Sequence, residues 1–354
     1  MNRLLLVIFA LLTLGGHSQA SDWSDAKYFP STGDNSGNIH ATVDPVFQEV
    51  FNQVDQKSLI KTLKQLSGSE PVMVNGATYS ISERYSPEGK TKFRAFWRQY
   101  FTSLGIANQE LSYNTQHSIG ENQGHNLEAI LPGKSHDSIV VIVHYDSTGP
   151  MGQETSNTAV DDDMTGMATM LEAAKILSKY QGHLQQTIRF VAADYEEHTG
   201  PGLEGARQYA QYLKTTSAQL GFKIIAAVDN EQSGWNCARE GVCGGARTSA
   251  GFDVFSCSGD GAGYEFSQLG DLLVETAQVY SQLPASRGCI GANSDHYALW
   301  EIGIPAVVFS EHNPFDNPHF DQNGGDTFEK IDQDYFYHIA QIGITFTARI
   351  AGLN

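Results

Sequence analysis

The sequence predicts an α/β fold in which a largely parallel sheet carries helices on both faces. Short apolar runs rich in β-branched residues recur along the chain, as expected for strands that are covered on both sides. A segment between the first two runs has apolar residues at helical spacing, so strand, helix and strand alternate. The four runs are SIVVIV (138–143), TIRFVAA (187–193), KIIAAV (223–228) and PAVVFS (305–310), and the helical segment is MTGMATMLEAAKILSKY (164–180).

The residues before these strands predict two helical stretches and a strand. PVFQEVFNQVDQKSLIKTLKQLSG (45–68) is one helix-like segment, which lies in an N-terminal cap or removable pro-segment over residues 21–70. KTKFRAFWRQYFTSLG (90–105) predicts a further helix and precedes the strand-like HNLEAILPG (125–133). Residues 71–354 are then expected to form one catalytic domain.

The first 20 residues are typical of a secretory signal peptide. They contain one positive residue, Arg3, an apolar run from Leu4 to Leu14, and small residues at Ser18 and Ala20 around a cleavage point. No other apolar run approaches the length of a membrane span. We therefore expect an exported protein, in a periplasm or outside the cell, whose mature form has no membrane segment.

The composition is strongly acidic. The 40 Asp and Glu residues outnumber the 22 Lys and Arg residues, which gives a formal net charge of −18. Such a charge disfavours nucleic acid and anionic membrane surfaces as partners, and it favours cationic ligands and metal ions. The oligomeric state is left open by these observations.

All four cysteines lie in one third of the chain. They are Cys237, Cys243, Cys257 and Cys289. Export permits disulfides, and we favour the pairing of the two sequence neighbours Cys237 and Cys243 among the connectivities that four cysteines allow. A cysteine-type zinc site is disfavoured because CxxC spacing is absent.

Polar side chains follow three of the predicted strands. His144 and Asp146 follow the first strand, Glu196 and Glu197 the second, and Asp229 the third. Ligands in open α/β sheets bind beyond the carboxyl ends of the strands. These five side chains are therefore predicted to surround one site.

Each of these motifs alone also has a purely structural interpretation, but together they favour a metal. One Asp of VDDDMTG (160–166) would suffice to cap the following helix, and three adjacent carboxylates repel one another unless a cation is near. The adjacent Glu196 and Glu197 would point to opposite sides of an extended chain, so one can bind metal while the other faces a water. A loop-rich region adds His296, His312 and His319.

Carboxylates and imidazoles without thiolates are typical of a hydrolytic zinc site. The set is large enough for two zinc ions about 3.5–4 Å apart, and these would need a bridging carboxylate. The middle aspartate of the triplet, Asp162, is well placed for that role.

The order of the motifs resembles the co-catalytic di-zinc aminopeptidases, bacterial leucyl-type exopeptidases related to the glutaminyl cyclases. HxDS, xDDxxG before a helix, EE, a strand ending in D, SDHxxxxxxGIPA and H…GDT follow one another over about residues 124–335. The resemblance implies a phosphorylase/hydrolase-like three-layer α/β/α sandwich with a mixed, mostly parallel sheet. It also implies hydrolysis of the N-terminal bond of peptides that have a free α-amine.

The resemblance further implies a role for each polar residue. Glu196 would be the general base toward a water held by the two zinc ions, and Asp146 would orient His144. Five side chains would hold the ions: His144 and Asp229 the first, Glu197 and His319 the second, and Asp162 both.

Two places depart from the family pattern. The last histidine usually stands closer to its Asp-Thr pair than His319 stands to Asp326 and Thr327, so a loop insertion is implied and His312 is a second candidate. Some relatives have a Cys and a Tyr before Ser-Asp-His, where this chain has CIGANSDH (289–296). No oxyanion-assisting group is assigned for that reason.

Three other functions stay open. A glutaminyl cyclase is a single-zinc acyltransferase with the same fold, and the aspartate triplet and Asp229 disfavour it. A non-catalytic binding ectodomain is disfavoured because no expected ligand position is replaced. A carboxypeptidase on the same metal core is the third alternative, and the sequence does not discriminate against it.

Overall fold

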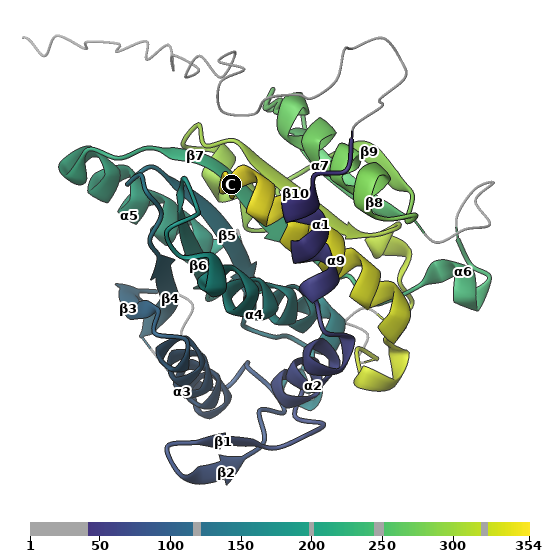
Figure 1. Cartoon of the computed structure of the whole chain (residues 1–354). Helices are drawn as coiled ribbons and strands as arrows, with labels where there is room; N and C mark the ends of the chain where they lie inside the picture. The colour runs from purple at the N-terminus through teal and green to yellow at the C-terminus, as the bar shows by residue number, and fades with distance from the viewer. Residues whose placement is uncertain (1–41, 116–121, 198–201, 244–250, 320–324) are drawn as a thin grey trace, which may run out of the picture.

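The computed structural model describes residues 42–115, 122–197, 202–243, 251–319 and 325–354 (Figure 1). The predicted signal peptide, residues 1–20, lies outside the described residues. None of the described helices is both long enough and apolar enough to cross a membrane.

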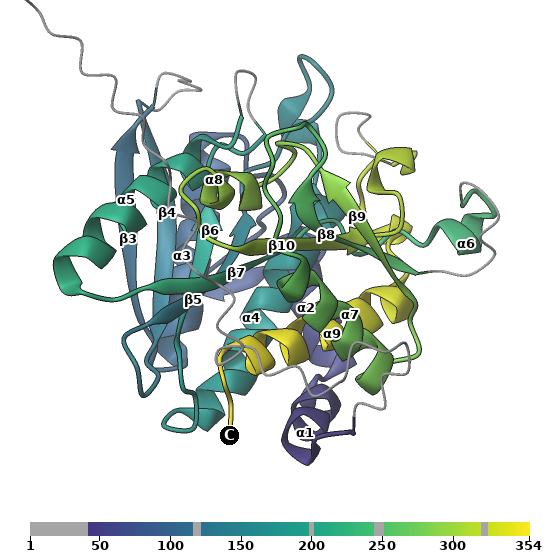
Figure 2. The ribbon, with the colours of Figure 1, turned by 90° about the horizontal axis from the view of Figure 1, so that it is seen from above.

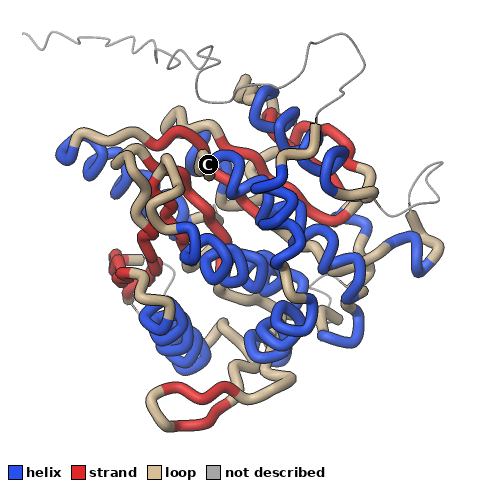
Figure 3. Tube along the Cα trace, in the orientation of Figure 1, coloured by secondary structure: helices blue, strands red, loops and turns tan. Residues whose placement is uncertain are grey.

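An eight-stranded mixed sheet forms the centre of the fold, with the strand order β3-β4-β6-β5-β7-β10-β8-β9. A two-stranded hairpin is separate from it, at the bottom of the view in Figure 3. The strands of the sheet are β3 (Ala107–Asn114), β4 (Gln123–Leu131), β5 (Ser138–His144), β6 (Thr187–Ala193), β7 (Ile224–Asn230), β8 (Phe252–Ser258), β9 (Ala285–Ile290) and β10 (Ala306–Glu311). The hairpin strands are β1 (Val72–Val74) and β2 (Ala77–Tyr79).

The middle of the sheet is parallel, as predicted. β5 pairs parallel with both β6 and β7, β7 pairs parallel with β10, and β8 pairs parallel with β9. Antiparallel pairs join β3 to β4, β4 to β6 and β8 to β10. Every residue of β5, β6, β7 and β10 is buried, which explains why these strands are continuous apolar runs. The predicted α/β fold class is confirmed.

Helices cover both faces of the sheet (Figure 2). α4 and α9 contact β5 and β7 from one face, and α5 and α8 contact β4, β6, β7 and β10 from the other. The longer helices are α3 (Pro87–Ser103), α4 (Gly166–Leu177), α5 (Glu204–Leu220), α7 (Ser267–Tyr280) and α9 (Gln333–Ile350). Two short helices are α6 (Cys237–Glu240) and α8 (His296–Trp300).

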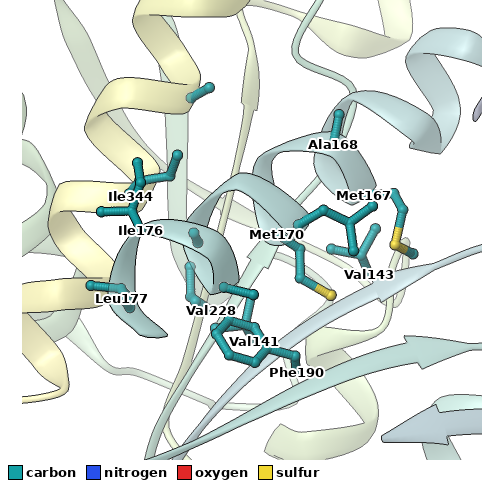
Figure 4. Close-up of a cluster of buried hydrophobic side chains, with 14 of the residues drawn as sticks. Val141, Val143, Met167, Ala168, Met170, Ile176, Leu177, Phe190, Val228 and Ile344 are labelled. Carbon is teal, nitrogen blue, oxygen red and sulfur yellow. The ribbon is translucent and has the colours of Figure 1, made fainter. Parts of the chain in front are cut away.

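Alternate residues of β5 serve two separate apolar cores. Val141 and Val143 belong to the core under α4 and α9, whereas Val140 and Ile142 belong to the core under α5 and α8. Figure 4 shows Met170 of α4 in the first of these cores, beside Val141. Truncating a buried methionine of this kind to alanine costs about 2–5 kcal/mol of stability. The two cores fix β5, and with it the position of its last residue, His144.

The segment predicted as one helix over residues 45–68 is two helices, α1 (Pro45–Gln53) and α2 (Gln56–Leu66). Val54 between them is extended, and the Asp55 side chain accepts a hydrogen bond from the Ser58 amide at 2.9 Å. A new helix begins here because that carboxylate satisfies an amide of the first turn. α1 packs on α9 and α2 on α4, and the division of the chain at residue 70 stays a prediction.

Candidate metal centre

The candidate site lies where β5, β6 and β7 end side by side. A cavity of about 480 Å³ opens there, and it is lined by His144 together with Asp162, Glu196, Glu197 and Glu231, four carboxylates that we call its acidic floor. His144 is the last residue of β5, and Glu231 directly follows β7. The parallel pairing of β5 with both neighbours brings these strand ends to one edge of the sheet.

His144 is buried and held at both ring nitrogens. Its Nδ1 lies 3.2 Å from the carbonyl oxygen of Asp146, and its Nε2 lies 2.9 Å from Asp162 Oδ1. In the neutral ring, the first contact requires the proton on Nδ1 and leaves Nε2 as a metal ligand. Burial alone would lower the pKa of His144, but the hydrogen bonds to Asp146 and Asp162 raise it well above its ordinary value. A metal ion at Nε2 would take the place of that extra proton.

The three aspartates of the triplet have three different partners. Asp161 Oδ1 accepts from the Gly234 amide at 2.7 Å, and Asp163 Oδ1 accepts from the Gly166 amide at 2.9 Å. Asp162 alone contacts His144. The triplet lies in η2 (Val160–Thr165), a π-helical turn before α4 in which Asp162 and Asp163 have non-helical backbone angles and are joined by a cis peptide bond. The three adjacent carboxylates thus have separate contacts: Asp161 anchors the loop at Gly234, Asp162 faces the site, and Asp163 binds the start of α4.

Asp326 fixes the backbone of the triplet from the opposite side. Its carboxylate accepts the amides of Asp161 and Asp162 at 2.8–3.0 Å, and its carbonyl oxygen accepts from Thr158 Oγ1 at 2.8 Å. Asp326 belongs to the Asp-Thr pair of the family pattern, and the sequence assigned this pair no role beyond its distance from His319. The structure assigns it the task of holding the loop that carries Asp162.

Asp146 orients the two glutamates through their main chain. Its Oδ1 accepts the Glu196 amide at 3.0 Å and its Oδ2 accepts the Glu197 amide at 3.1 Å. The distance from His144 Nδ1 to Asp146 Oδ1 is 3.7 Å, longer than the contact of the same nitrogen with the Asp146 carbonyl. Asp146 therefore contacts the histidine mainly through its carbonyl oxygen and the glutamates through its carboxylate.

The two carboxylates at the end of β7 differ in what they face. Asp229 Oδ2 accepts from Ser294 Oγ at 2.8 Å and from the His296 amide at 2.9 Å. Glu231 Oε1 lies 3.8 Å from His144 Nε2 and accepts from Ser294 Oγ at 2.5 Å. Sequence reasoning missed Glu231, although a residue two positions beyond Asp229 projects from the same side of an extended chain. That spacing was the available signal.

His319 and His312 are placed apart from the acidic floor. His319 Nε2 lies 3.1 Å from Glu240 Oε1 in α6, and its side chain is 19% exposed. His312 Nδ1 lies 3.0 Å from Asp253 Oδ1. Within the described residues, the ligand atoms that gather within 4.8 Å of one another form two groups, His144 with Asp163 and Glu231, and His144 with Asp162 and Glu197. Neither His319 nor His312 is in these groups.

The donor set fits metal ions. Asp163 Oδ2 is buried and has no hydrogen-bond partner within the described residues, although it belongs to the first of the two groups. Burial raises the pKa of Asp163, Glu196 and Glu231 well above the ordinary carboxyl range, and neighbouring carboxylates add to the rise. Bound cations would remove this cost, and imidazole with carboxylate oxygen is a donor set that zinc accepts.

Large apolar side chains also line the cavity, and we call them its apolar wall. This wall is formed by Leu203, Phe255, Ile290, Val308, Pro314 and Phe315. Phe315 is 62% exposed, so a large aromatic ring borders the opening. A disulfide between Cys257 and Cys289 joins β8 to β9 beside Phe255 and Ile290.

The predicted disulfide between Cys237 and Cys243 is confirmed. It closes a short loop around α6, the helix that carries Glu240. With Cys257 and Cys289 also paired, no cysteine of the chain is left free.

Known leucine aminopeptidases are similar to this chain in sequence. A probable leucine aminopeptidase of Arthroderma otae is 26% identical over 282 residues, which cover 74% of this chain and 72% of that protein. Leucine aminopeptidase 1 of Trichophyton rubrum is 24% identical over 231 residues, which cover 64% of this chain and 58% of that protein.

Solved structures share the fold. The LapA aminopeptidase of Legionella pneumophila matches with a TM-score of 0.66 and 15% identity over 87% of this chain and 75% of its own. The glutaminyl cyclase of Fimbriiglobus ruber matches with a TM-score of 0.63 and 22% identity over 84% of this chain and 96% of its own. The sequence profile of Peptidase family M28 matches residues 126–347, more than half of the chain. The chain therefore belongs to peptidase family M28.

Proposed function

We propose that this protein is a zinc aminopeptidase that removes the N-terminal residue from peptides with a free α-amine. One observation carries the proposal: ligand atoms of His144, Asp162 and Glu197 gather within 4.8 Å of one another, in a cavity that Glu196 also lines. A carboxylate beside a metal group, rather than in it, is the arrangement that a general base requires. The leucine aminopeptidases among the relatives support the same class of reaction.

Two zinc positions are proposed, an inner one and an outer one. The inner position takes His144 and Asp162, with Glu231 favoured over Asp229 because Glu231 Oε1 lies 3.8 Å from His144 Nε2 and Glu231 shares a ligand group with His144, whereas Asp229 is in neither of the groups found among the described residues. Asp162 is shared with the outer position, since its carboxylate belongs with that of Glu197 to the second group.

Glu197 and His319 complete the outer position in this proposal. His319 contacts Glu240 in the structure, so it would exchange that carboxylate for the ion. His312 is the weaker alternative, because it is buried against Asp253.

The chemistry assigned to Glu196 is proton transfer. Bound zinc ions would polarise the scissile carbonyl and lower the pKa of a nearby water towards about 7. Glu196 accepts the proton of the attacking water and delivers it to the leaving amine. Its amide is fixed by Asp146, so the position of its backbone does not depend on the substrate. The acidic floor of the cavity supplies an anchor for the α-ammonium group of the peptide.

A glutaminyl cyclase is the second candidate. The cyclase of Fimbriiglobus ruber shares the fold and is almost wholly covered by the match. The position of His319, away from the other proposed ligands, also favours a single ion over two. The existence of two ligand groups, one with Glu231 and one with Glu197, favours two ions and therefore the peptidase.

A substrate panel with metal analysis on the same sample tests the proposal. Amino-acid amides and unblocked peptides should be cleaved, and N-acetylated copies of the same peptides should not. Two zinc ions should be bound per chain. Release of the C-terminal residue from N-blocked peptides would establish a carboxypeptidase, and cyclisation of N-terminal Gln with one zinc would establish the cyclase.

Export is part of the proposal. Two disulfides are typical of proteins in an oxidising compartment, and the N-terminal signal predicted from the sequence accounts for how the chain reaches one. Free peptides in a periplasm or outside the cell would then be the substrates.

A further inference from the structure

A single arginine contacts both segments that bring His144 and Asp162 together. We propose that Arg84 is a positioning residue, which holds these two segments at the spacing that the inner metal position needs. The inference rests on the proposed metal centre. Arg84 lies in residues 42–115, outside the part of the chain that the family profile matches, so it adds to the site from a part of the chain that the family match does not reach.

Arg84 is completely buried, and among the residues that the structure describes its guanidinium donates only to backbone carbonyls. Nε donates to the carbonyl of Tyr145 at 2.8 Å, and one terminal nitrogen donates to those of Thr158 and Ala159 at 3.1 and 2.9 Å. The other terminal nitrogen donates to Leu66 in α2 at 3.2 Å. A planar fork with several donors can span several carbonyls at once, which a lysine ammonium cannot do in the same geometry.

The acceptors identify what the arginine positions. Tyr145 directly follows His144, and Ala159 stands three residues before Asp162. Ala159 has a φ of 45°, a left-handed conformation that a residue with a Cβ seldom adopts and that its surroundings must enforce. Arg84 holds the carbonyl of this strained residue on one side of the loop, while Asp326 holds the amides of Asp161 and Asp162 on the other.

The charge of Arg84 matches its surroundings. A buried cation without a carboxylate in contact is costly, and burial lowers the pKa of Arg84 to about 10, whereas the nearby charges of Asp326, Glu83, Asp146 and Asp162 counteract that effect. The guanidinium is therefore an internal counter-charge to carboxylates around the site, of which Asp162 lines the cavity. It stabilises the carboxylates without occupying the cavity.

A second buried cation of the same segment acts on another strand end. Lys90 Nζ contacts Asp194 Oδ1 at 2.6 Å and lies 3.5 Å from the centre of the Tyr195 ring. Tyr195 precedes Glu196 and has a φ of 60°. The contacts of Lys90 are thus with the exit of β6, and those of Arg84 are with the exit of β5 and the η2 turn.

The test compares Arg84→Met and Arg84→Lys with Arg189→Met. Arg189 is a matched control, because it is a buried arginine bonded to Glu128 and Ser138, and neither of these lines the cavity. Zinc affinity is measured by chelator competition, unfolding is measured on zinc-free protein, and kcat and KM are measured on an amino-acid amide.

We expect Arg84→Met to lower the affinity for the inner zinc ion by about 10–100-fold, because the loss of groups that hold metal ligands in place commonly has an effect of this size. Arg84→Lys should show a smaller loss, with kcat falling more than KM rises. Arg189→Met should lower the unfolding temperature and leave zinc affinity unchanged. Wild-type zinc affinity in both Arg84 variants would overturn the inference, and if Arg84→Met does not fold, Arg84→Lys decides alone.

A readout without metal separates this inference from the proposed function. Amide hydrogen exchange at Asp161 and Asp162 in zinc-free protein should be faster in Arg84→Lys than in the wild type, and unchanged in Arg189→Met. If the wild type binds no zinc, the proposed function fails, while this exchange still decides whether Arg84 holds the loop.

Discussion

The inner and outer halves of the proposed metal centre are built differently. The inner half uses His144 at the end of β5, Asp162 in η2 and Glu231 after β7, and the first two are 1% and 6% exposed. The outer half uses Glu197, beyond the end of β6, and His319, whose ring is paired with Glu240. The fold itself thus positions the ligands of the inner half and the backbone of Glu197, and His319 is the ligand that needs the ion to complete its position.

The largest effect is expected where the two halves share a ligand. Asp162→Asn keeps the size of the side chain and removes its charge, so both ions should be lost or bound far more weakly. Activity should fall to background, as measured on an amino-acid amide with zinc analysis of the same sample. Retention of either ion at wild-type affinity would show that Asp162 does not bridge them.

The next largest effect distinguishes the base from a ligand. Glu196→Gln should retain both ions and lower kcat by about 10²–10⁴-fold with little change in KM, because only proton acceptance is removed. Glu197→Gln removes a ligand of the outer half, so added zinc should restore part of its activity. The roles are reversed if Glu196→Gln is the variant that loses metal and recovers with zinc.

The β7 carboxylates test the inner half. Glu231→Gln should lower the affinity of the inner ion by more than about 100-fold, whereas Asp229→Asn, which acts through Ser294 and His296, should cost about 10-fold. Chelator competition on the two single variants measures both. A larger loss in Asp229→Asn would return the ligand role to Asp229.

The stabilising effect of zinc should depend on pH. Burial raises the pKa of Asp163 and Glu231 in the metal-free fold. A carboxyl group with a raised pKa binds its proton more tightly in the folded protein than in the unfolded chain. Its contribution to stability is complete below the pKa of the unfolded chain, about 4, and is lost as pH rises through the pKa of the folded protein. Zinc-free protein should therefore unfold at lower temperature as pH increases towards 8, and zinc should oppose this loss.

Differential scanning at fixed zinc excess measures that dependence. Saturation at about 100-fold above Kd corresponds to about 2.7 kcal/mol, or a rise in Tm on the order of 5 °C near neutral pH. The rise should shrink towards about pH 5, where protons displace the ion. An increase in Tm that does not change with pH would argue against carboxylate ligands in these raised-pKa positions.

The smallest effect concerns the ion pair of the outer half. Glu240→Gln should release His319 from its ion pair and raise the affinity for the outer ion by no more than about fivefold. The reason is that a partly exposed ion pair such as His319 with Glu240 contributes about 0.2–1 kcal/mol. His319→Ala should weaken the same ion, and His312→Ala should leave it unchanged. Should His312→Ala be the variant that loses the outer ion, the histidine assignment must be exchanged.

The sequence predicted the buried central strands and α4, and it did not predict the long helices α5, α7 and α9. β5, β6, β7 and β10 are buried on both faces and read as apolar runs, so their positions followed directly. β3 and β9 lie at the two edges of the sheet and are partly exposed, so polar residues interrupt their pattern and neither was predicted. The break between α1 and α2 was also missed, although Asp55 is a good N-cap, because apolar helical spacing continues across it.

The candidate site was predictable in its strand ends and not in its contacts. His144, Glu196 and Glu197 follow apolar runs and were found from position alone. Whether Asp229 or Glu231 faces His144 depends on how far β7 extends before its side chains reach the cavity, which no spacing in the sequence specifies. Arg84 was missed because its partners are backbone carbonyl groups. Every residue has such a group, so no residue type in the sequence marks the partners.

The Asp146 carboxylate, which accepts the amides of both Glu196 and Glu197, separates two tasks along the chain. It ties the exit of β6 to the exit of β5, so the spacing between base and metal ligand is set within residues 144–197. The apolar wall comes almost entirely from residues 255–315. Substitutions in the wall can therefore change which side chain the cavity accepts while the reactive groups keep their geometry. In such an architecture the substrate preference of a peptidase can change while its catalytic groups stay in place.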